Sequence, residues 1–230
     1  MPSCLVAQRH RRDLENKGQC MSRRIGHIIL MGWLVVAAGC LTPRAEAPPL
    51  HTYQLTLDEW STEHCPTDIK GPVLLVSVPQ PEPGFDTTRM VYLKRQYELE
   101  YYAVNQWADV PARLFGPLLV QALGRIGMWR AVIPLPSSVH GNYRLDSYGF
   151  AVQQEFLQQP SRVRVTVRAQ FVELQTATVV GVRTFEAIEP APRDDAYGGV
   201  QAANRATIAI LNQVGSWLQG CVQRPAECGR

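Results

Sequence analysis

The side chain with the most distinctive chemistry in this sequence is the thiol of Cys40, which directly follows the small residues Ala37 to Gly39. These small residues end an apolar run that begins at Ile25, and the basic pair Arg23-Arg24 precedes the run. A basic region, a short apolar region and small residues are the three parts of a secretory signal peptide. A cysteine placed directly after them offers a sulfur nucleophile. Cys40 is therefore a candidate site of covalent modification.

The segment Leu34 to Cys40, which reads Leu-Val-Val-Ala-Ala-Gly-Cys, resembles a bacterial lipobox. In a lipobox the cysteine receives a diacylglyceryl group on sulfur and becomes the first residue of the mature protein. Ala37 departs from the pattern, because the position three before the cysteine usually carries Leu. Two alternatives stay open. One is a transmembrane helix over Ile25 to Leu41, which at about 17 residues is at the lower limit for a span, and the other is plain secretion with Cys40 in a disulfide.

The first twenty residues, Met1 to Cys20, fit no part of a signal peptide, which begins with its basic region. Met21, followed by Ser-Arg-Arg, is the better start. We interpret residues 1–20 as a misassigned start, and a cytoplasmic tail is the alternative.

The charge balance argues against nucleic acid as a partner. The whole chain has 23 Lys and Arg and 20 Asp and Glu, of which residues 1–39 hold six basic and two acidic ones. The part from Cys40 onward keeps 17 basic and 18 acidic residues, a net charge of −1. This balance favours neither nucleic-acid nor anionic-membrane binding. Membrane attachment is expected to come from the lipid on Cys40.

Three cysteines follow Cys40, namely Cys65, Cys221 and Cys228. They allow one disulfide and leave one thiol spare, and the spacing does not decide which pair forms. A bridge involving Cys65 is slightly favoured, because closing a longer loop restricts the unfolded chain more. Three free thiols are the alternative. The sequence has no CxxC motif and predicts no zinc or other metal site.

Enzymatic chemistry is not expected. The chain has no G-x-S-x-G motif and no Gly-rich phosphate loop. The three histidines after Cys40, at positions 51, 64 and 140, have no nucleophile or carboxylate at a suggestive spacing. Glu98 and Glu100 share one side of a predicted strand and could only mimic a catalytic carboxylate pair. We therefore expect a non-catalytic protein with no cofactor other than covalent lipid.

Hydrophobic periodicity predicts a mixed sheet with two main helices packed against it. Short β-branched or alternating runs predict strands at 51–57, 73–78, 89–93, 96–102, 129–135, 144–156, 162–174 and 178–187. Apolar residues three and four apart predict a helix from Asn105 to Ile126, with a kink at Gly116-Pro117. A second helix is expected from Asp194 or Asp195, as its N-cap, to Cys221.

The chain is expected to divide into four segments. Residues 1–39 are the signal peptide region, and residues 40–50 are a lipidated tether whose three prolines favour an extended chain. Residues 51–222 form the folded domain, and residues 223–230 are a loose tail. The 191 residues from Cys40 onward suffice for one domain with a substantial core.

Several features occur in an order that resembles the ABC-type transport auxiliary lipoproteins, which include lipoproteins of the paraquat-inducible type. The similarity extends from Tyr53 to Leu218, and its sharpest point is Trp107. The features are the lipobox, the segment Arg89 to Leu93, the pair Tyr101-Tyr102, the segment Asn105 to Ala108, a helix ending at Leu123, a long hairpin and an alanine-rich final helix ending at Trp217-Leu218. The Gly116-Pro117 pair and the insert between Ile69 and Arg89 depart from the pattern.

The resemblance implies an α/β fold, a three-layer α/β/α sandwich with a mixed sheet. It implies a lipoprotein with acyl chains such as palmitate on Cys40, anchored at the periplasmic face of the outer membrane, a placement that Leu41 after Cys40 also favours. The implied partners are the permease and ATPase of an ABC transporter and a protein with mammalian-cell-entry domains, and a homo-oligomer is a further expectation. The implied cargo is lipid moved between membranes. The alternative is a structural envelope lipoprotein of a cell-wall, pilus, secretion or lipopolysaccharide assembly machine.

Three aromatic residues and one arginine are candidates for contact with a partner or with lipid. Tyr101, Tyr102 and Trp107 offer large contact areas, although aromatic residues at a strand–helix junction more often belong to the core. Arg89 could pair with a carboxylate of a partner, or be solvated or internally paired.

Three more arginines, Arg162, Arg164 and Arg168, share one face of a predicted strand. Three like charges cannot be buried there without partners. The row is therefore expected to be a solvated face, or else a rim for acidic residues of a partner or for lipid headgroups.

Overall fold

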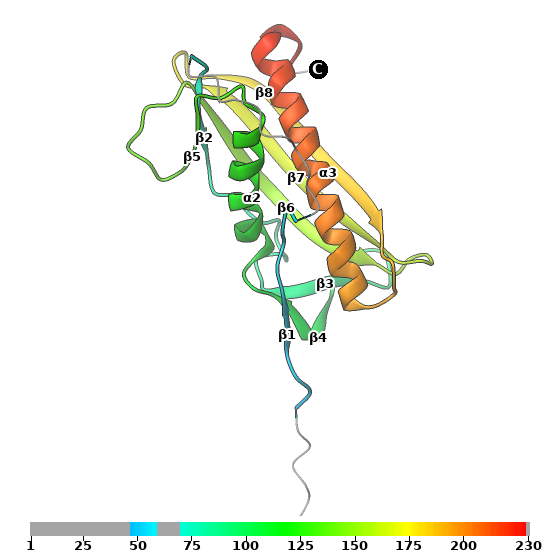
Figure 1. The fold of residues 1–230 in the computed structure, drawn as a ribbon. Coiled ribbons are helices and arrows are strands. Elements are labelled where there is room, and N and C mark those ends of the chain that lie inside the picture. The colour runs from blue at the N-terminus through cyan, green and yellow to red at the C-terminus, as the bar shows by residue number, and fades with distance from the viewer. Residues whose placement is uncertain (1–46, 59–69, 229–230) are drawn as a thin grey trace, which may run out of the picture. The chain divides into compact units, whose positions relative to one another are not determined.

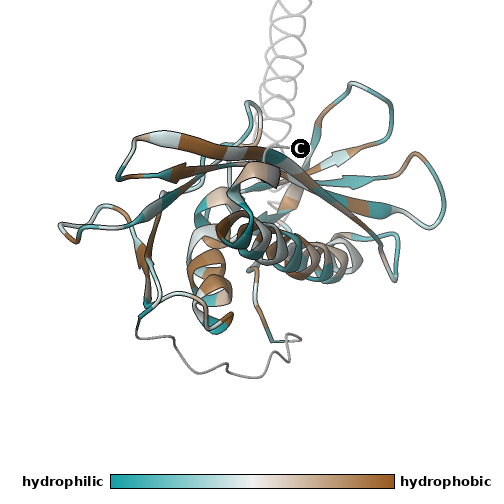
Figure 2. Ribbon diagram, turned by 90° about the horizontal axis from the view of Figure 1, so that it is seen from above, coloured by the Kyte–Doolittle hydropathy of each residue, from teal (hydrophilic) through white to brown (hydrophobic). Residues whose placement is uncertain are grey.

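Within residues 47–58 and 70–228, which the computed structural model describes, eight strands form one mixed sheet and two long helices lie against its concave face (Figures 1 and 2). The chain divides into two units, Met1–Pro48 and Pro49–Arg230, and the sheet and both helices belong to the second. The expected signal region, the lipidation site Cys40 and the cysteine Cys65 lie outside the described residues. The described part contains no helix that is both long enough and apolar enough to cross a membrane.

The elements follow one another in a mixed α/β order. They are β1 (His51–Tyr53), β2 (Val73–Val76), β3 (Arg89–Leu93), β4 (Glu100–Trp107), α2 (Pro111–Arg125), β5 (Ala131–Pro134), β6 (Tyr143–Glu155), β7 (Arg162–Glu173), β8 (Thr178–Pro190), α3 (Ala196–Gln223) and the 3₁₀ turn η1 (Pro225–Glu227). The predicted α/β class, mixed sheet and two main helices are confirmed. Both helices lie on one side of the curved sheet (Figure 2), so the described part has a single helix layer in place of the two helix layers of the implied α/β/α sandwich.

The long strand β6 organises the sheet, whose order is β1-β4-β3-β6-β2-β5. Its first residues run parallel to β2, with Leu145 opposite Val76, and its last residues run parallel to β3, with Glu155 opposite Leu93. On its other side β6 pairs with β7 along its length, and β8 follows β7. Parallel and antiparallel pairs therefore meet on one strand, which makes the sheet mixed.

Strand β7 carries the clearest agreement between sequence and structure. Its alternate apolar side chains are all buried in the core: Val163, Val165, Val167, Ala169 and Phe171. The three arginines occupy the other face, as the two-residue period requires. Helix α3 covers the apolar face, and its N-cap Asp195 accepts a hydrogen bond from the backbone N–H of Gly198 at 2.6 Å. The predicted Asp cap is thereby confirmed.

The predicted start of the first helix, Asn105, is wrong. Residues Asn105 to Trp107 belong to β4, where they pair with His51 to Tyr53 of β1. The backbone N–H of Trp107 also donates to the carbonyl of Thr88 at 2.7 Å. Sheet pairing therefore overrides the helical spacing of these residues, and α2 begins only at Pro111.

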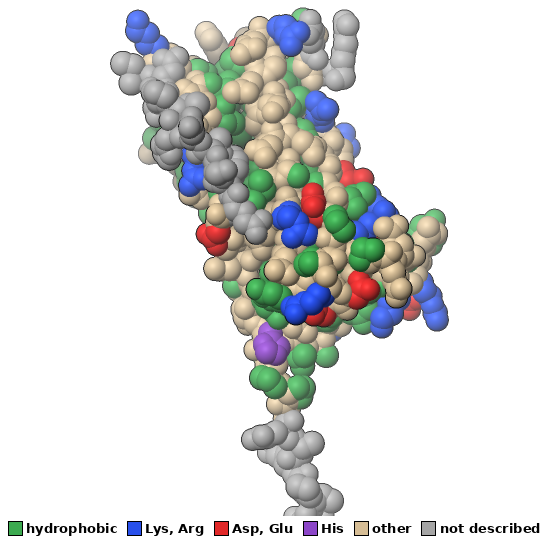
Figure 3. All heavy atoms as spheres, turned by 45° about the vertical axis from the view of Figure 1, so that its right-hand side comes forward, with side chains coloured by type: hydrophobic (Ala, Val, Ile, Leu, Met, Phe, Trp, Pro, Cys, Tyr) green, Lys and Arg blue, Asp and Glu red, His purple; other side chains and the backbone are tan. Residues whose placement is uncertain are grey.

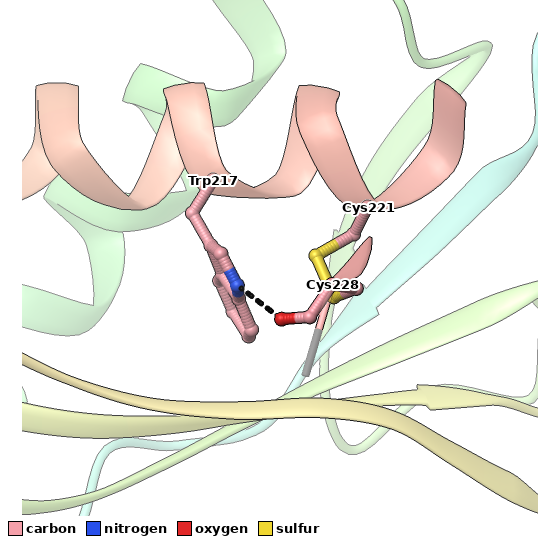
Figure 4. The surroundings of a disulfide bond; sticks show 3 residues. All are labelled: Trp217, Cys221 and Cys228. Carbon is pink, nitrogen blue, oxygen red and sulfur yellow. Dashed lines mark hydrogen bonds between the residues drawn. A yellow bond between two sulfur atoms is a disulfide. The ribbon is translucent and has the colours of Figure 1, made fainter. Parts of the chain in front are cut away.

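The C-terminal segment is also more ordered than the loose tail that the sequence predicts. Helix α3 continues to Gln223, η1 turns the chain back, and Cys228 forms a disulfide with Cys221 across a Cα–Cα distance of 4.6 Å (Figure 4). The preference for a bridge with Cys65 is therefore wrong for these two thiols. A seven-residue separation suffices because the turn brings Cys228 under the helix.

Cys228 packs against Gly181 of β8, where any larger side chain would collide with its sulfur atom. A side chain carbon on Gly181 of β8 would lie 2.5 Å from the sulfur of Cys228, closer than atoms can approach. The indole N–H of Trp217 donates to the carbonyl of Cys228 at 3.4 Å (Figure 4). The disulfide, the indole and Gly181 together fasten the end of α3 to β8.

Candidate functional site

An open apolar groove of about 520 Å³ lies between α2 and the ends of β2 and β5. Most of the lining residues are Val, Leu or Pro, and the full lining is Val76, Ser77, Val78, Pro79, Arg113, Gly116, Pro117, Val120, Gln121, Pro134 and Leu135. Its volume falls in the range of about 300–1,000 Å³ that is typical of small-molecule sites. Exposed aliphatic walls of this kind suit the apolar part of a ligand.

The Gly116-Pro117 pair shapes the helical wall of this groove. A side chain carbon on Gly116 would lie 3.1 Å from the Pro79 ring, so glycine allows α2 to approach the segment after β2 closely. Pro117 has no N–H and cannot bond to the carbonyl of Arg113 one turn earlier. The pair that departs from the family pattern therefore forms part of this apolar groove.

The charged residue in the lining of the groove is Arg113, whose Nε donates to Asp109 at 2.9 Å. The same carboxylate accepts the backbone N–H of Val110 at 2.7 Å. The bond from Val110, followed by that from Arg113, holds the pKa of Asp109 below its usual value. An exposed cation thus lies at the rim while aliphatic side chains form the walls, which is an amphipathic arrangement.

Two of the three arginines in the predicted row form ion pairs with a glutamate on the convex face of the sheet. Arg162 and Arg164 donate through Nε to the two oxygens of Glu155, at 2.8 and 2.6 Å. Glu155 is only 3% exposed. Its burial by itself raises the pKa, but the hydrogen bonds from Arg164, Arg162 and Gln153 outweigh burial and lower it. These two arginines are therefore engaged within the domain.

The third member of the row, Arg168, is exposed and lies over the ring of Tyr148 at 5.7 Å. Figure 3 shows the side of the domain that lies to the right in Figure 1, where Lys and Arg are interspersed with Asp and Glu and no large area of one sign appears. The row is a paired and solvated face, with Arg168 as its most available member.

Two other predicted residues, Arg89 and Tyr101, contact each other. The Arg89 guanidinium lies 4.7 Å from the centre of the Tyr101 ring. The Tyr101 hydroxyl donates to the carbonyl of Gly84 at 3.1 Å, and its ring packs on a small apolar cluster of Phe85, Val91 and Ala151. Tyr101 therefore holds the loop before β3 against the convex face of the sheet, and Arg89 covers its ring.

Tyr102 points to the opposite, buried side. Its hydroxyl donates to Gln154 at 3.0 Å, and burial raises its pKa. The Gln154 amide in turn donates to Ser161 at 3.0 Å and to the carbonyl of Asp195 at 3.2 Å. Tyr102 therefore helps to seat the start of α3.

Trp107 is a core residue with 2% exposure, as the core alternative expects, so its ring is not presented to a partner or to lipid. The candidate contact residues consequently do not form one site. The sequence signal for the groove was the Gly116-Pro117 pair, but only the fold shows that Val78 and Leu135 face it from other elements. Among the described residues, no group of three or more His, Cys, Asp or Glu is arranged to hold a metal.

Comparisons with known proteins agree with this architecture. A crystal structure of a Xanthomonas campestris protein of the DUF330 family superposes with a TM-score of 0.63 at 18% identity, covering 78% of this chain and 97% of the other. A crystal structure titled only as an uncharacterized protein gives a TM-score of 0.56 at 12% identity, covering 74% and 99%. At these identities the likeness shows the shared fold. A search of curated proteins gives no match.

The family model for the ABC-type transport auxiliary lipoprotein component matches residues 53–215, which is most of the chain. This interval contains strands β2 to β8, α2 and most of α3. The chain belongs to the ABC-type transport auxiliary lipoprotein family.

Proposed function

We propose that this lipoprotein is a non-catalytic component of an ABC-type intermembrane lipid transport system and binds the acyl part of its cargo in the groove between α2, β2 and β5. The proposal combines the family, which is an auxiliary component of ABC transport, with the groove itself. The groove is the observation that carries it, because its aliphatic walls match a hydrocarbon chain and no described metal centre or catalytic motif competes with it.

The physical reason is the cost of exposing hydrocarbon to water. Burial contributes roughly 25 cal/mol for each Å² of apolar surface removed from water. Val78 and Val120 can cover an acyl chain, and Arg113 at the rim can meet a phosphate oxygen with a charge-assisted hydrogen bond. The open side of the groove allows the lipid to leave, which a transport component requires.

The proposed setting is the periplasmic face of the outer membrane, with the chain anchored through acyl groups on Cys40. The proposed partners are the permease and ATPase of the ABC transporter and a protein with mammalian-cell-entry domains. Energy would then come from the ATPase subunit, since this chain has no phosphate-binding loop.

The groove can be tested in cells by placing a photoreactive phenylalanine at Val78 and labelling lipids with radioactive phosphate. The diacylglyceryl anchor contains no phosphate, so a labelled protein band reports phospholipid at the inserted residue. The matched control is Val179, at the start of β8, because it is also a valine and is exposed to a similar degree, 49% against 56% for Val78. We expect label at position 78 and little at 179. Equal labelling at both positions, or none at 78, would contradict a lipid site in the groove.

A further inference from the structure

One end of the sheet carries exposed apolar side chains that the groove does not explain. At this end β3 and β6 finish and β4 and β7 begin, as the pairs Leu93↔Glu155 and Glu155↔Arg162 show. The two hairpin tips here, residues 94–99 and 156–161, lie side by side, because the Phe156 backbone N–H donates to the Leu93 carbonyl at 2.8 Å. Tyr97, Leu99 and Leu157 are exposed on these tips.

Tyr97 is the most unusual of these residues, because it is 99% exposed and has φ of 69°. This left-handed backbone region suits glycine or asparagine at a turn and is unfavourable for a bulky side chain. The ring contributes almost no burial to the domain in return. The fold therefore gives no reason for an aromatic residue at this position, and a contact outside the domain does.

The chain enters the sheet at the end of the domain where β3 and β4 lie. Strand β1 runs parallel to the last residues of β4, with His51 opposite Asn105, and β1, β3 and β4 lie at the end of the domain away from β2 and β5 (Figure 1). At the start of α3, the exposed Tyr197 packs near β1, with the centre of its ring 6.2 Å from the centre of the Tyr53 ring.

The tether is short enough to keep this end near the membrane. Ten residue steps separate Cys40 from Leu50, which limits the extended distance to about 36 Å. A tether of this kind makes a second contact intramolecular, at an effective concentration on the order of millimolar. Even a few aromatic side chains, too weak to bind a membrane alone, can then determine how the domain lies.

The charged residues of the β3–β4 tip indicate which kind of surface the tip can contact. Lys94 pairs with Glu100 and Arg95 with Glu98, both at 3.7 Å, so the β3–β4 tip has no net charge. A neutral tip with an exposed tyrosine matches the headgroup layer of a zwitterionic bilayer, where tyrosine is enriched. It does not match a strongly acidic protein or lipid surface.

We propose that the tips of the β3–β4 and β6–β7 hairpins rest on the headgroup layer of the membrane that holds Cys40, with Tyr97 and Leu157 as contact residues. The lipid anchor and these side chains together fix the orientation of the domain. This inference depends on lipidation at Cys40 but not on transport or on the groove.

The test uses the full lipidated protein in vesicles of brominated phosphatidylcholine, with no other protein present. Tyr97→Trp and, separately, Leu157→Trp place a reporter at the proposed contact. Val139→Trp is the control, because it is exposed in the loop before β6, at the other end of that strand. Bromine quenches an indole only at close range, and the emission of the parent protein is subtracted.

We expect the reporters at 97 and 157 to be quenched at least about twofold more than the reporter at 139, with little change at high salt because the contact is uncharged. Equal quenching at all three positions would overturn the proposal. Lipid labelling at Val78 is measured separately, so failure here leaves the proposed function standing.

Discussion

Glu155 at the end of β6 accepts a hydrogen bond from Nε of Arg164 on β7 at 2.6 Å, across the two strands that form the centre of the sheet. Because Arg162 binds the other oxygen at 2.8 Å, this nearly buried carboxylate joins two cations that would otherwise repel each other. On the convex face, two of the three arginines that the sequence shows in a row are therefore neutralised by one glutamate of the neighbouring strand.

Replacing Glu155 with Gln should lower the free energy of unfolding by about 2 kcal/mol, because charge-assisted hydrogen bonds from two arginines are weakened. Chemical denaturation measures the change. The matched control is Glu186→Gln, whose side chain is about half exposed, and it should cost less than about 1 kcal/mol. Equal effects of the two variants would contradict a special role for Glu155.

The same carboxylate predicts a pH dependence. Its pKa is lower in the folded state than the ordinary value of 4.5, so its contribution to stability is present above that value and is lost as the pH falls through the folded pKa. Denaturation between neutral pH and pH values below 4.5 should show this loss in the parent protein. Glu155→Gln should show a smaller loss over the same range, and identical slopes would contradict the assignment.

Trp107→Ala should destabilise the domain by about 3–5 kcal/mol, because the ring is buried at the junction of β1, β4 and the loop before β3. Thermal unfolding is the measurement. The control Tyr97→Ala removes an aromatic side chain that is fully exposed and should leave melting nearly unchanged. An unchanged melting temperature in Trp107→Ala would show that the indole is not part of the core.

Removal of the disulfide by the double change Cys221→Ala and Cys228→Ala should cost about 2 kcal/mol, the amount expected for closing a short loop. Hydrogen exchange should increase at η1 and at the last turn of α3, which the bond fastens to Gly181, and should change little in β7. A uniform increase over the whole sheet would mean that the disulfide supports the fold globally.

Cys40→Ala should abolish incorporation of labelled palmitate and leave the unfolding of the domain unchanged. The label tests acylation directly, and the Cys65→Ala variant is the control because its palmitate label should persist. Continued labelling of Cys40→Ala would contradict the assignment of the lipidation site.

The sequence predicts the structure best where the apolar residues fit either the two-residue period of a strand or the helical period, but not both. The alternation in β7 predicted the buried faces of Val163 and Phe171 correctly, and Asp195 marked the start of α3. The sequence places Asn105 to Trp107 in a helix because Trp107 also matches the helical spacing of the apolar residues that follow, while the partner strand β1 is some fifty residues away. Local spacing cannot show that pairing.

The candidate site was less predictable than the fold. Nothing in the sequence places Val78, Val120 and Leu135 around one groove, because they come from three separate parts of the chain. The arginine row could be recognised, but its carboxylate partner Glu155 lies on the preceding strand and becomes evident only from the register. Loop-closure entropy likewise favoured Cys65, whereas the 3₁₀ turn after α3 decides the pairing of Cys228.

The central claim is tested most directly by purifying the native lipoprotein from detergent-solubilised membranes and identifying the proteins and lipids that accompany it by mass spectrometry. The account predicts recovery of an ABC permease, its ATPase or a protein with mammalian-cell-entry domains, together with phospholipid that is reduced in a Val78→Asp variant but not in Val179→Asp. Recovery of only pilus, secretion or cell-wall components would contradict the transport role.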